Sequence, residues 1–196
     1  MLELSLCGIR LKMSFSFFAI LAVVLAIDSR APVLTALLCC LFHELGHIFF
    51  MCLYGIPPKS ILLYGGGFRL EPNRGRMISV RQDVTILLAG SGANLALYGF
   101  STLFFAGAPA LATFARANLI FGLFNLLPFK YFDGGQVAEK LFGESHHYAT
   151  VRIYRLVRLV LAGLVAGVLF YLVFFCKMNA SLLLTLLYVV VSELFF

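Results

Sequence analysis

The chain has 196 residues, of which 62% are hydrophobic and only 12% are charged, and its mean hydropathy is +0.99. Soluble domains carry about 25% charged residues, and a core of this size cannot bury so much apolar surface. This composition excludes a soluble globular protein and an intrinsically disordered one. The formal net charge of +6 is better explained by basic residues in the cytosolic loops of a membrane protein than by binding to nucleic acid.

Six apolar runs are long enough, or nearly so, to cross a bilayer as helices. In chain order they cover residues 13–27, 31–53, 84–107, 110–129, 156–176 and 181–196. We therefore expect an α-helical polytopic membrane protein with about six transmembrane helices, folded as a single domain over residues 1–196. The first run follows Arg10 and Lys12 and could instead be a signal peptide that is cleaved after Ala26.

The distribution of basic residues predicts the orientation of these helices. If the N-terminus is cytosolic, twelve of the 15 Lys and Arg residues fall on the cytosolic side. Only Arg30 and Lys177 face outward, and Arg116 lies near the outer end of the fourth run. Positive residues accumulate in cytosolic loops. We therefore expect a multi-pass protein of the cell membrane with both termini in the cytosol.

The polar stretch between the second and third runs does not have a helical pattern. Residues 60–64 and 67–70 read as short strands, Gly65, Gly66 and Gly67 interrupt them, and residues 77–80 could form a third strand. Two interpretations remain open. One is a plain cytosolic hairpin loop, and the other is a small β-hairpin-like segment whose strand edge lies at the membrane near the second helix.

The second run contains three ionisable side chains in a stretch of five residues, His43-Glu44-Leu45-Gly46-His47. On a helix, residues four apart share one face, so both imidazoles can bind one metal ion. A catalytic zinc ion takes neutral imidazole ligands and keeps an open position for water, and Glu44 is placed to accept a proton from that water. Ionisable groups in a membrane helix are costly and usually functional, which favours a zinc site over a polar helix contact.

A catalytic zinc ion usually has three protein ligands, and spacing alone leaves the third one open. Asp133 follows the fourth run, at the cytosolic end of that run, and the two histidines lie toward the cytosolic end of the second run. The glycines after Asp133 would let the backbone come close to the site. Asp-Gly is also a common turn pair at a helix end. Glu139 and Glu144 are rival ligands, and the polar stretch around them favours solvated side chains.

With both motifs in view, the sequence resembles the site-2 proteases, a family of intramembrane zinc metalloproteases. That family combines H-E-x-x-H in one membrane helix with N-x-x-P-x-x-x-x-D-G in a later one. The residues that match the second motif are Asn125, Pro128, Asp133 and Gly134. Residues 89–94 resemble the G-x-x-x-N element of the intervening helix, with Ser91 where a proline is frequent. The resemblance covers about residues 9–140.

The resemblance implies a zinc metalloendopeptidase with one Zn²⁺ held by His43, His47 and Asp133. It also implies that Glu44 is the general base. The implied substrate contacts are Asn94 and Asn125, which would orient the substrate or stabilise the oxyanion, and Gly65, Gly66 and Gly67, which lie where a substrate could add as a strand. The catalytic core then spans about residues 31–140, with additional helices at 13–27, 156–176 and 181–196.

The implied substrate is a membrane-spanning or membrane-associated protein that is cleaved in regulated intramembrane proteolysis. Examples are the precursor of a transcription factor or sigma factor, or an anti-sigma factor. With one helix before H-E-x-x-H, the chain is most similar to the compact bacterial branch that includes the sporulation-type proteases. Besides the lipid bilayer, a regulatory membrane protein is an expected partner. Two alternatives remain: a membrane metal transporter, which would not need Glu44 as a base, and an inactive protease-like scaffold.

Overall fold

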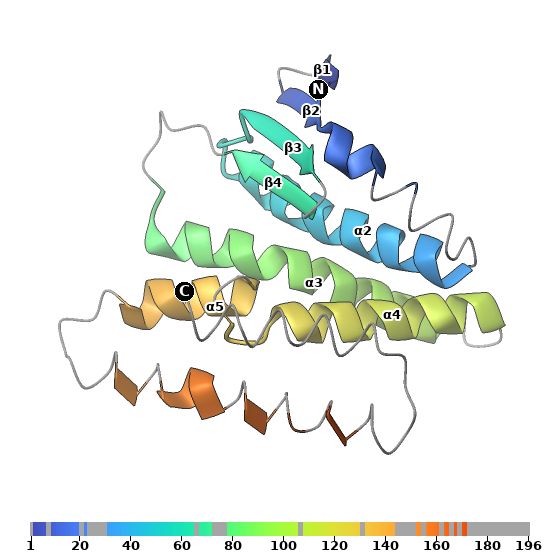
Figure 1. The fold of residues 1–196 in the computed structure, drawn as a ribbon, viewed down its shortest axis with the longest axis vertical. Coiled ribbons are helices and arrows are strands. Elements are labelled where there is room, and N and C mark those ends of the chain that lie inside the picture. Colours follow the sequence, from blue (N-terminus) through green and yellow to red (C-terminus); the bar gives the residue numbers. More distant parts are fainter. Residues whose placement is uncertain are drawn as a thin grey trace. The chain divides into compact units, whose positions relative to one another are not determined.

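The computed structural model describes residues 2–6, 9–19, 22, 31–64, 67–71, 78–105, 108–129, 132–143, 152–153, 156–160, 163–164, 167 and 170–171. The chain divides into two compact units, Met1–Asn125 and Leu126–Phe196. The first unit contains a four-stranded sheet and the long helices α2, α3 and α4 (Figure 1). The second contains α5 and a short π-helix.

Helix α2 covers Ala31–Leu53, the bounds predicted for the second apolar run. It ends where Gly55 adopts a φ of 68°, a conformation that a residue without a Cβ adopts at little cost. The Ile56 amide then donates to the Met51 carbonyl, which closes the helix in a Schellman motif. Met51 and Ile56 also pack together with Ile86. The chain therefore leaves α2 in a fixed direction.

The sheet has the strand order β1-β2-β3-β4. Its strands are β1 (Leu2–Leu6), β2 (Ile9–Met13), β3 (Ser60–Tyr64) and β4 (Gly67–Glu71). The pairs β1–β2 and β3–β4 are antiparallel, whereas β2 and β3 are parallel, because the long segment with α2 crosses over between them. The predicted hairpin of β3 and β4 is confirmed. The sequence did not lead us to expect β1 and β2, which extend this hairpin into a sheet.

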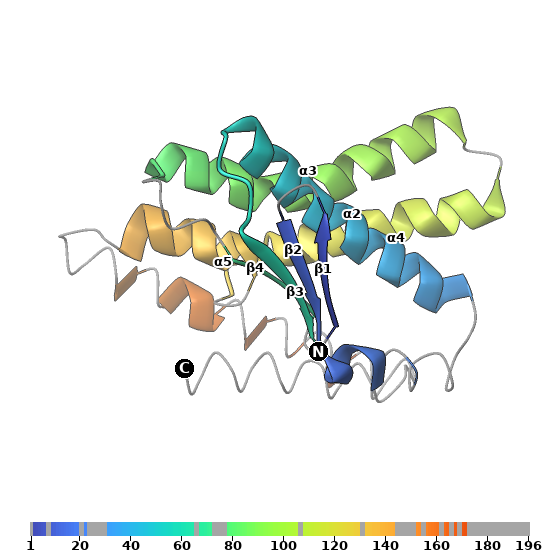
Figure 2. The same ribbon diagram turned by 90° about the horizontal axis from the view of Figure 1, so that it is seen from above.

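The strand register gives the sheet one apolar and one polar side. Neighbouring residues form an apolar row of Leu4, Leu11, Ile61 and Leu70, and a polar row of Ser5, Arg10, Ser60 and Glu71. Leu70 packs on the cluster at the end of α2, and Figures 1 and 2 show the sheet next to that helix. In the polar row, the Ser60 hydroxyl donates to the Glu71 carboxylate.

Helix α3 (Val80–Phe104) starts earlier than the apolar run at 84–107 predicts. The reason is a capping box, in which Ser79 Oγ accepts from the Gln82 amide and Gln82 Oε1 accepts from the Ser79 amide. This cap also makes the predicted third strand at 77–80 wrong, because Val80 is already helical. Met77 lies outside the described residues.

Helix α4 (Pro109–Asn125) begins with a proline, a residue suited to the first helical position. It ends four residues before the limit predicted for the run at 110–129. Helix α3 packs against both α2 and α4. A Cβ at Gly46 would lie 2.5 Å from the Ala89 carbonyl oxygen, and one at Gly122 would lie 3.2 Å from the Ser91 carbonyl oxygen. Glycines on α2 and α4 therefore let their backbones approach α3 closely.

In the second unit, Phe129 is buried against Leu127 and Phe132. Helix α5 (Asp133–Ala138) follows at once, and the π-helix Glu139–Gly143 continues it. Further along, residues 156–160, 163–164, 167 and 170–171 are helical, in agreement with a helix at 156–176. The predicted helix at 181–196 lies outside the described residues.

Among the residues that the structure describes, two helices are long and apolar enough to cross a membrane, Leu34–Leu53 and Val80–Phe104. They correspond to the second and third predicted runs. The first run, at 13–27, starts differently from our expectation, because Met13 is the last residue of β2 and residues 15–19 are helical. The molecule is thus mostly helical with a small sheet. The total of about six spans and the single domain over residues 1–196 stay predictions.

Candidate metal centre

Helix α2 buries the side that carries the ionisable motif. Cys39, His43 and His47 are spaced four apart and are 1%, 5% and 7% exposed, whereas Leu45 on another side is 46% exposed. Glu44 follows His43 directly and is half-buried. The predicted placement of both histidines on one helix face is therefore observed.

Helix α3 fixes the orientation of the His47 ring. His47 Nδ1 lies 2.7 Å from the main-chain carbonyl oxygen of Ile86. A carbonyl oxygen only accepts hydrogen bonds, so Nδ1 carries the ring proton. In the neutral ring Nε2 is then unprotonated, which is the state that a metal ligand requires.

The Nε2 atoms of His43 and His47 are spaced as a zinc ion would require. They lie 3.2 Å apart, and two nitrogen ligands of a tetrahedral zinc ion, each about 2.0–2.1 Å from the metal, are about 3.3 Å apart. The two rings are perpendicular, with their centroids 4.7 Å apart. Because the proton of His47 is on Nδ1, its Nε2 is available as a metal ligand without a change of tautomer.

Helices α3 and α4 pack against the imidazole rings of His43 and His47. A Cβ at Gly90 of α3 would lie 2.6 Å from His47 Cε1 and 2.8 Å from His43 Cε1. The ring of Phe121 on α4 meets the His43 ring edge to face, with centroids 5.5 Å apart. The histidines thus lie in a cradle built by α2, α3 and α4, all within the first unit.

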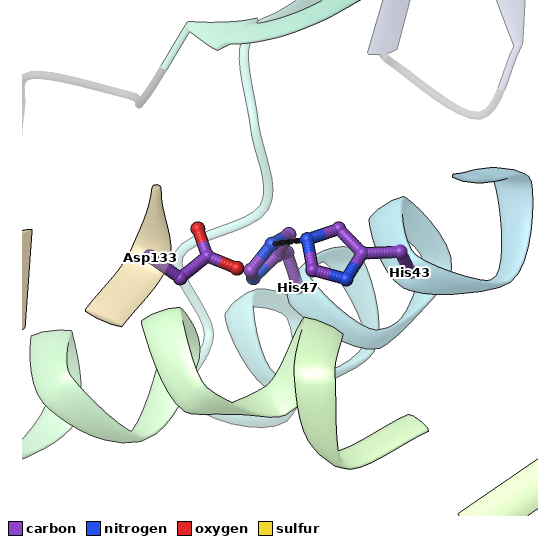
Figure 3. Close-up of side chains that lie close together, drawn as sticks. All are labelled: His43, His47 and Asp133. Atoms are coloured by element: carbon purple, nitrogen blue, oxygen red, sulfur yellow. Dashed lines mark hydrogen bonds between the residues drawn. The ribbon is translucent and has the colours of Figure 1, made fainter. Parts of the chain in front are cut away.

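Asp133 is the first residue of α5 and is 8% exposed. His43, His47 and Asp133 form a group that could hold a metal ion, because one ligand atom of each lies within 4.8 Å of the others (Figure 3). Two imidazole nitrogens and one carboxylate oxygen are a donor set typical of catalytic zinc. Together with the cradle at Gly90, this donor set fits zinc.

The other predicted site residues are placed as follows. Asn94 is fully buried, and its Nδ2 donates to the Cys39 carbonyl and to Asn118 Oδ1. Asn125 Nδ2 donates to the Phe121 carbonyl within α4. Gly67 is the first residue of β4, whereas Gly65 and Gly66 lie outside the described residues. The rival ligand Glu139 is exposed at the start of the π-helix, and Glu144 also lies outside the described residues.

Sequence reasoning missed three contributions to this centre. The Ile86 carbonyl contacts His47 and the Phe121 ring contacts His43. Both are tertiary contacts, which no sequence motif predicts. Asn118 did leave a signal, because it is an amide inside an apolar run, and polar residues in membrane helices usually have a partner or a function. Here that partner is Asn94.

Comparisons with known proteins agree with this geometry. No family profile matches the chain. The fold is similar to the solved structure of the site-2 protease from Methanocaldococcus jannaschii, with a TM-score of 0.59, 24% sequence identity, and coverage of 98% of this chain and 93% of that chain. The zinc metalloprotease MJ0392 of the same organism is 28% identical over 150 residues, which are 71% of this chain and 44% of that protein. The chain is therefore similar to a site-2 protease in fold and to a zinc metalloprotease in sequence.

These two similarities support the resemblance to the site-2 proteases that the sequence motifs indicated. Together with the two apolar helices in the described part of the chain, they indicate a membrane protein. The group of His43, His47 and Asp133 is its candidate zinc site. The chain spans less than half the length of the curated relative that it matches.

Proposed function

We propose that this site-2 protease homologue is an intramembrane zinc metalloendopeptidase. The observation that supports this most directly is the convergence of His43 Nε2 and His47 Nε2, 3.2 Å apart on a buried face of an apolar helix. A membrane helix that only packs against its neighbours gains nothing from two converging imidazoles and a glutamate beside them. We further propose that Asp133 is the third ligand.

The roles of the side chains follow from their chemistry. When bound, zinc would supply an activated water and polarise the substrate carbonyl. Glu44 accepts the proton of the attacking water and passes it to the departing amine. His47 Nδ1 stays protonated during the reaction and donates to the Ile86 carbonyl oxygen, so its Nε2 stays unprotonated and free to bind the metal. His43 and Asp133 complete the ligand set.

The proposed substrate is a membrane-spanning or membrane-associated protein, which must expose an extended stretch of backbone to be cut. The sheet supports this proposal, because β1 and β4 are its edge strands and an edge strand can pair with an extended peptide. Gly67 opens β4 and remains a proposed contact, with Gly65 and Gly66 beside it in sequence. Asn94 and Asn125 are proposed helpers, although their Nδ2 groups already bond within the protein, which leaves their amide oxygens for a substrate.

The finer points of location and partners are also proposals. We propose a multi-pass protein with both termini in the cytosol, on the basis of the excess of Lys and Arg on one side. We also propose a place in the sporulation-type branch, with a sigma-factor or transcription-factor precursor or an anti-sigma factor as substrate and a regulatory membrane protein as partner. The short polar segments between the apolar runs support this placement.

The decisive experiment compares wild type with Glu44→Gln. The amide keeps the size of the carboxylate and loses its basicity, so the variant should retain zinc and lose about 10²–10⁴-fold in cleavage rate. Cleavage is measured by mass spectrometry on a panel of single-span membrane proteins reconstituted with the enzyme. Zinc retention with near-normal cleavage would place the base elsewhere. Zinc-dependent metal flux without cleavage would favour the transporter, and the absence of both activities would favour the scaffold.

A further inference from the structure

One face of α3 contacts both histidines although it supplies no ligand of its own. Ile86 and Gly90 are four residues apart and share this face. Ile86 offers its carbonyl oxygen to His47 Nδ1 at 2.7 Å. Gly90 lies one turn later, against the edges of both imidazole rings. A single turn of α3 therefore touches both of the rings on α2.

The missing side chain at Gly90 makes room for the rings. A Cβ there would overlap His47 Nε2 and would lie 2.6 Å from His47 Cε1 and 2.8 Å from His43 Cε1, whereas ordinary contact begins at 3.4 Å. The rings would have to retreat by at least about 0.6–0.8 Å, which is several times the roughly 0.2 Å by which metal–ligand distances vary. The smallest side chain would thus disturb both ligands at once.

Neither ring has an easy way to retreat. The His43 ring meets Phe121 of α4 edge to face, and the His47 ring is tied to Ile86 through Nδ1. Both histidines are more than nine-tenths buried. A displaced ring would have to break the Ile86 hydrogen bond or push α4 away, and either change would separate the two Nε2 atoms.

Two neighbouring glycines show that this constraint is specific. A Cβ at Gly92 would meet nothing within 4 Å. A Cβ at Gly46 would meet the Ala89 carbonyl oxygen at 2.5 Å and Ala93 Cβ at 2.9 Å, so it opposes helix packing without contacting an imidazole. An added Cβ would therefore meet a metal-binding side chain at Gly90, a helix backbone at Gly46 and open space at Gly92.

We propose that Gly90 is a positioning residue for the metal centre. With the Ile86 carbonyl, it sets the imidazoles of His43 and His47 in the one pose in which their Nε2 atoms converge. This inference rests on the proposed zinc site and adds to it a requirement on α3. It concerns the binding of the metal, so it can be tested without a protein substrate.

The first test titrates Zn²⁺ and Co²⁺ into purified wild type, Gly90→Ala and Gly92→Ala. Changes to residues that orient metal ligands typically cost about 10–100-fold in metal affinity. We expect a loss of this size in Gly90→Ala, together with an altered absorption spectrum of bound Co²⁺, and no change in Gly92→Ala. A merely structural role would lower the folded fraction and leave the spectrum of bound Co²⁺ unchanged. Wild-type affinity and spectrum in folded Gly90→Ala would overturn the proposal.

The second test remains decisive if Gly90→Ala folds poorly. The Gly90→Ala change is combined with His43→Ala and His47→Ala, and thermal stability without metal is compared across this mutant cycle. If the rings are the obstacle, Gly90→Ala should lower Tm by about 5 °C when they are present, and should leave Tm unchanged or raise it when they are absent, because alanine is the better helix former. An equal penalty in both backgrounds would overturn the proposal. Gly46→Ala should lower Tm in both, because its obstacle is α3 itself.

These outcomes separate the inference from the proposed function. If wild type binds no zinc, the proposed function fails, and the positioning role fails with it. If wild type binds zinc and Gly90→Ala binds it equally well, only the role of Gly90 is rejected. If zinc binding is weakened in Gly90→Ala and no substrate is cleaved by wild type, the positioning role stands and the protease assignment falls.

Discussion

His47 Nδ1 and the Ile86 carbonyl oxygen lie 2.7 Å apart, although the two residues are 39 positions apart in the chain. Metal-binding histidines usually donate their second N–H to such a group, which fixes the tautomer and makes the ligand nitrogen more basic. The contact between α2 and α3 is therefore part of the chemistry of the site. A change that separates these helices should act on metal binding before it acts on the fold as a whole.

The first prediction concerns metal content. Purified protein should contain about one zinc ion per chain, and His43→Ala or His47→Ala should lose it, because each removes one of the usual three protein ligands. Elemental analysis measures the loss. Cys39→Ala is the matched control, since Cys39 is buried on the same helix face one turn earlier and should be dispensable. Loss of zinc in this control would mean that the ligand set is incomplete as described.

The second prediction concerns the turn that leads to Asp133. A Cβ at Gly134 would overlap the Leu126 carbonyl, and both positions lie in the second unit. Overlap with backbone cannot be relieved by a rotamer change, so Gly134→Ala should destabilise the protein by about 1–3 kcal/mol. Differential scanning calorimetry in detergent should show a lower Tm, and elemental analysis a lower zinc content.

Gly163→Ala is the control for this turn. Gly163 is helical, and a Cβ there would meet nothing within 4 Å. Replacing an exposed helical glycine by alanine should stabilise the helix by up to about 1 kcal/mol. We therefore expect Gly134→Ala to lower the free energy of unfolding and Gly163→Ala to raise it. A neutral Gly134→Ala would show that the turn tolerates a second conformation.

Much of the fold was predictable because local signals mark its boundaries. The end of α2 is marked by a glycine followed by Pro57 and Pro58, and the break between β3 and β4 is marked by three glycines. The start of α3 was also marked, by Ser79 and Gln82 in capping-box spacing, but counting apolar residues placed it later. The strands β1 and β2 alternate apolar and polar residues, a strand pattern that the neighbouring apolar run obscured.

The part of the metal centre that could be predicted from the sequence consists of the side chains that would bind the metal or accept a proton. His43, Glu44 and His47 follow from a helical repeat, whereas the Ile86 carbonyl belongs to the backbone and has no signature in the sequence. The space at Gly90 also depends on which helix faces it. Asn94 was predictable as a polar residue in a span, but the contacts by which its Nδ2 joins α3 to α2 and α4 have no signature in the sequence.

The third prediction concerns topology. In a cysteine-free background, a cysteine at Asn179 should react with a membrane-impermeant maleimide added from outside. Cysteines at Arg74 and Ser145 should react only after the cytosolic face is exposed. The reason is the excess of basic residues on the side that carries the N-terminus. Outside labelling at Arg74 would reverse the orientation and place the H-E-x-x-H motif near the opposite surface.

The fourth prediction concerns acid sensitivity of the sheet. The hydrogen bond from Ser60, and then the charges of Lys12, Lys59 and Arg10, hold the pKa of Glu71 below its ordinary value of 4.5. A carboxyl group with a lowered folded-state pKa contributes stability that is complete above its unfolded pKa and is lost as the pH falls through the folded value. The β3–β4 hairpin should therefore weaken below pH 4.5, as followed by hydrogen exchange of its amides.

Ser60→Ala tests the cause of this shift. It removes the largest contribution, so the pKa of Glu71 should rise toward its ordinary value, and carbon NMR of the Glu71 carboxyl measures the change. Ser5→Ala is the control, because Ser5 lies in the same polar row on the far strand β1. An unchanged Glu71 pKa in Ser60→Ala would assign the shift to the basic residues instead.

The last prediction concerns the amide pair that joins the three helices. Asn94 Nδ2 donates to Asn118 Oδ1 at 3.2 Å and to the Cys39 carbonyl at 3.1 Å, and both asparagines are fully buried. Asn94→Ala removes both bonds and leaves the Asn118 acceptor buried without its donor. Hydrogen bonds between membrane helices contribute about 0.6 kcal/mol on average and up to about 1.7, so a cycle of Asn94→Ala and Asn118→Ala should show a coupling energy in this range. Unfolding in mixed micelles measures this coupling energy.

Thr113→Val is the control, because the Thr113 hydroxyl donates to the Pro109 carbonyl of its own helix and should not couple to Asn94. Additive losses for the two asparagines would mean that α2, α3 and α4 are held together by close backbone packing alone.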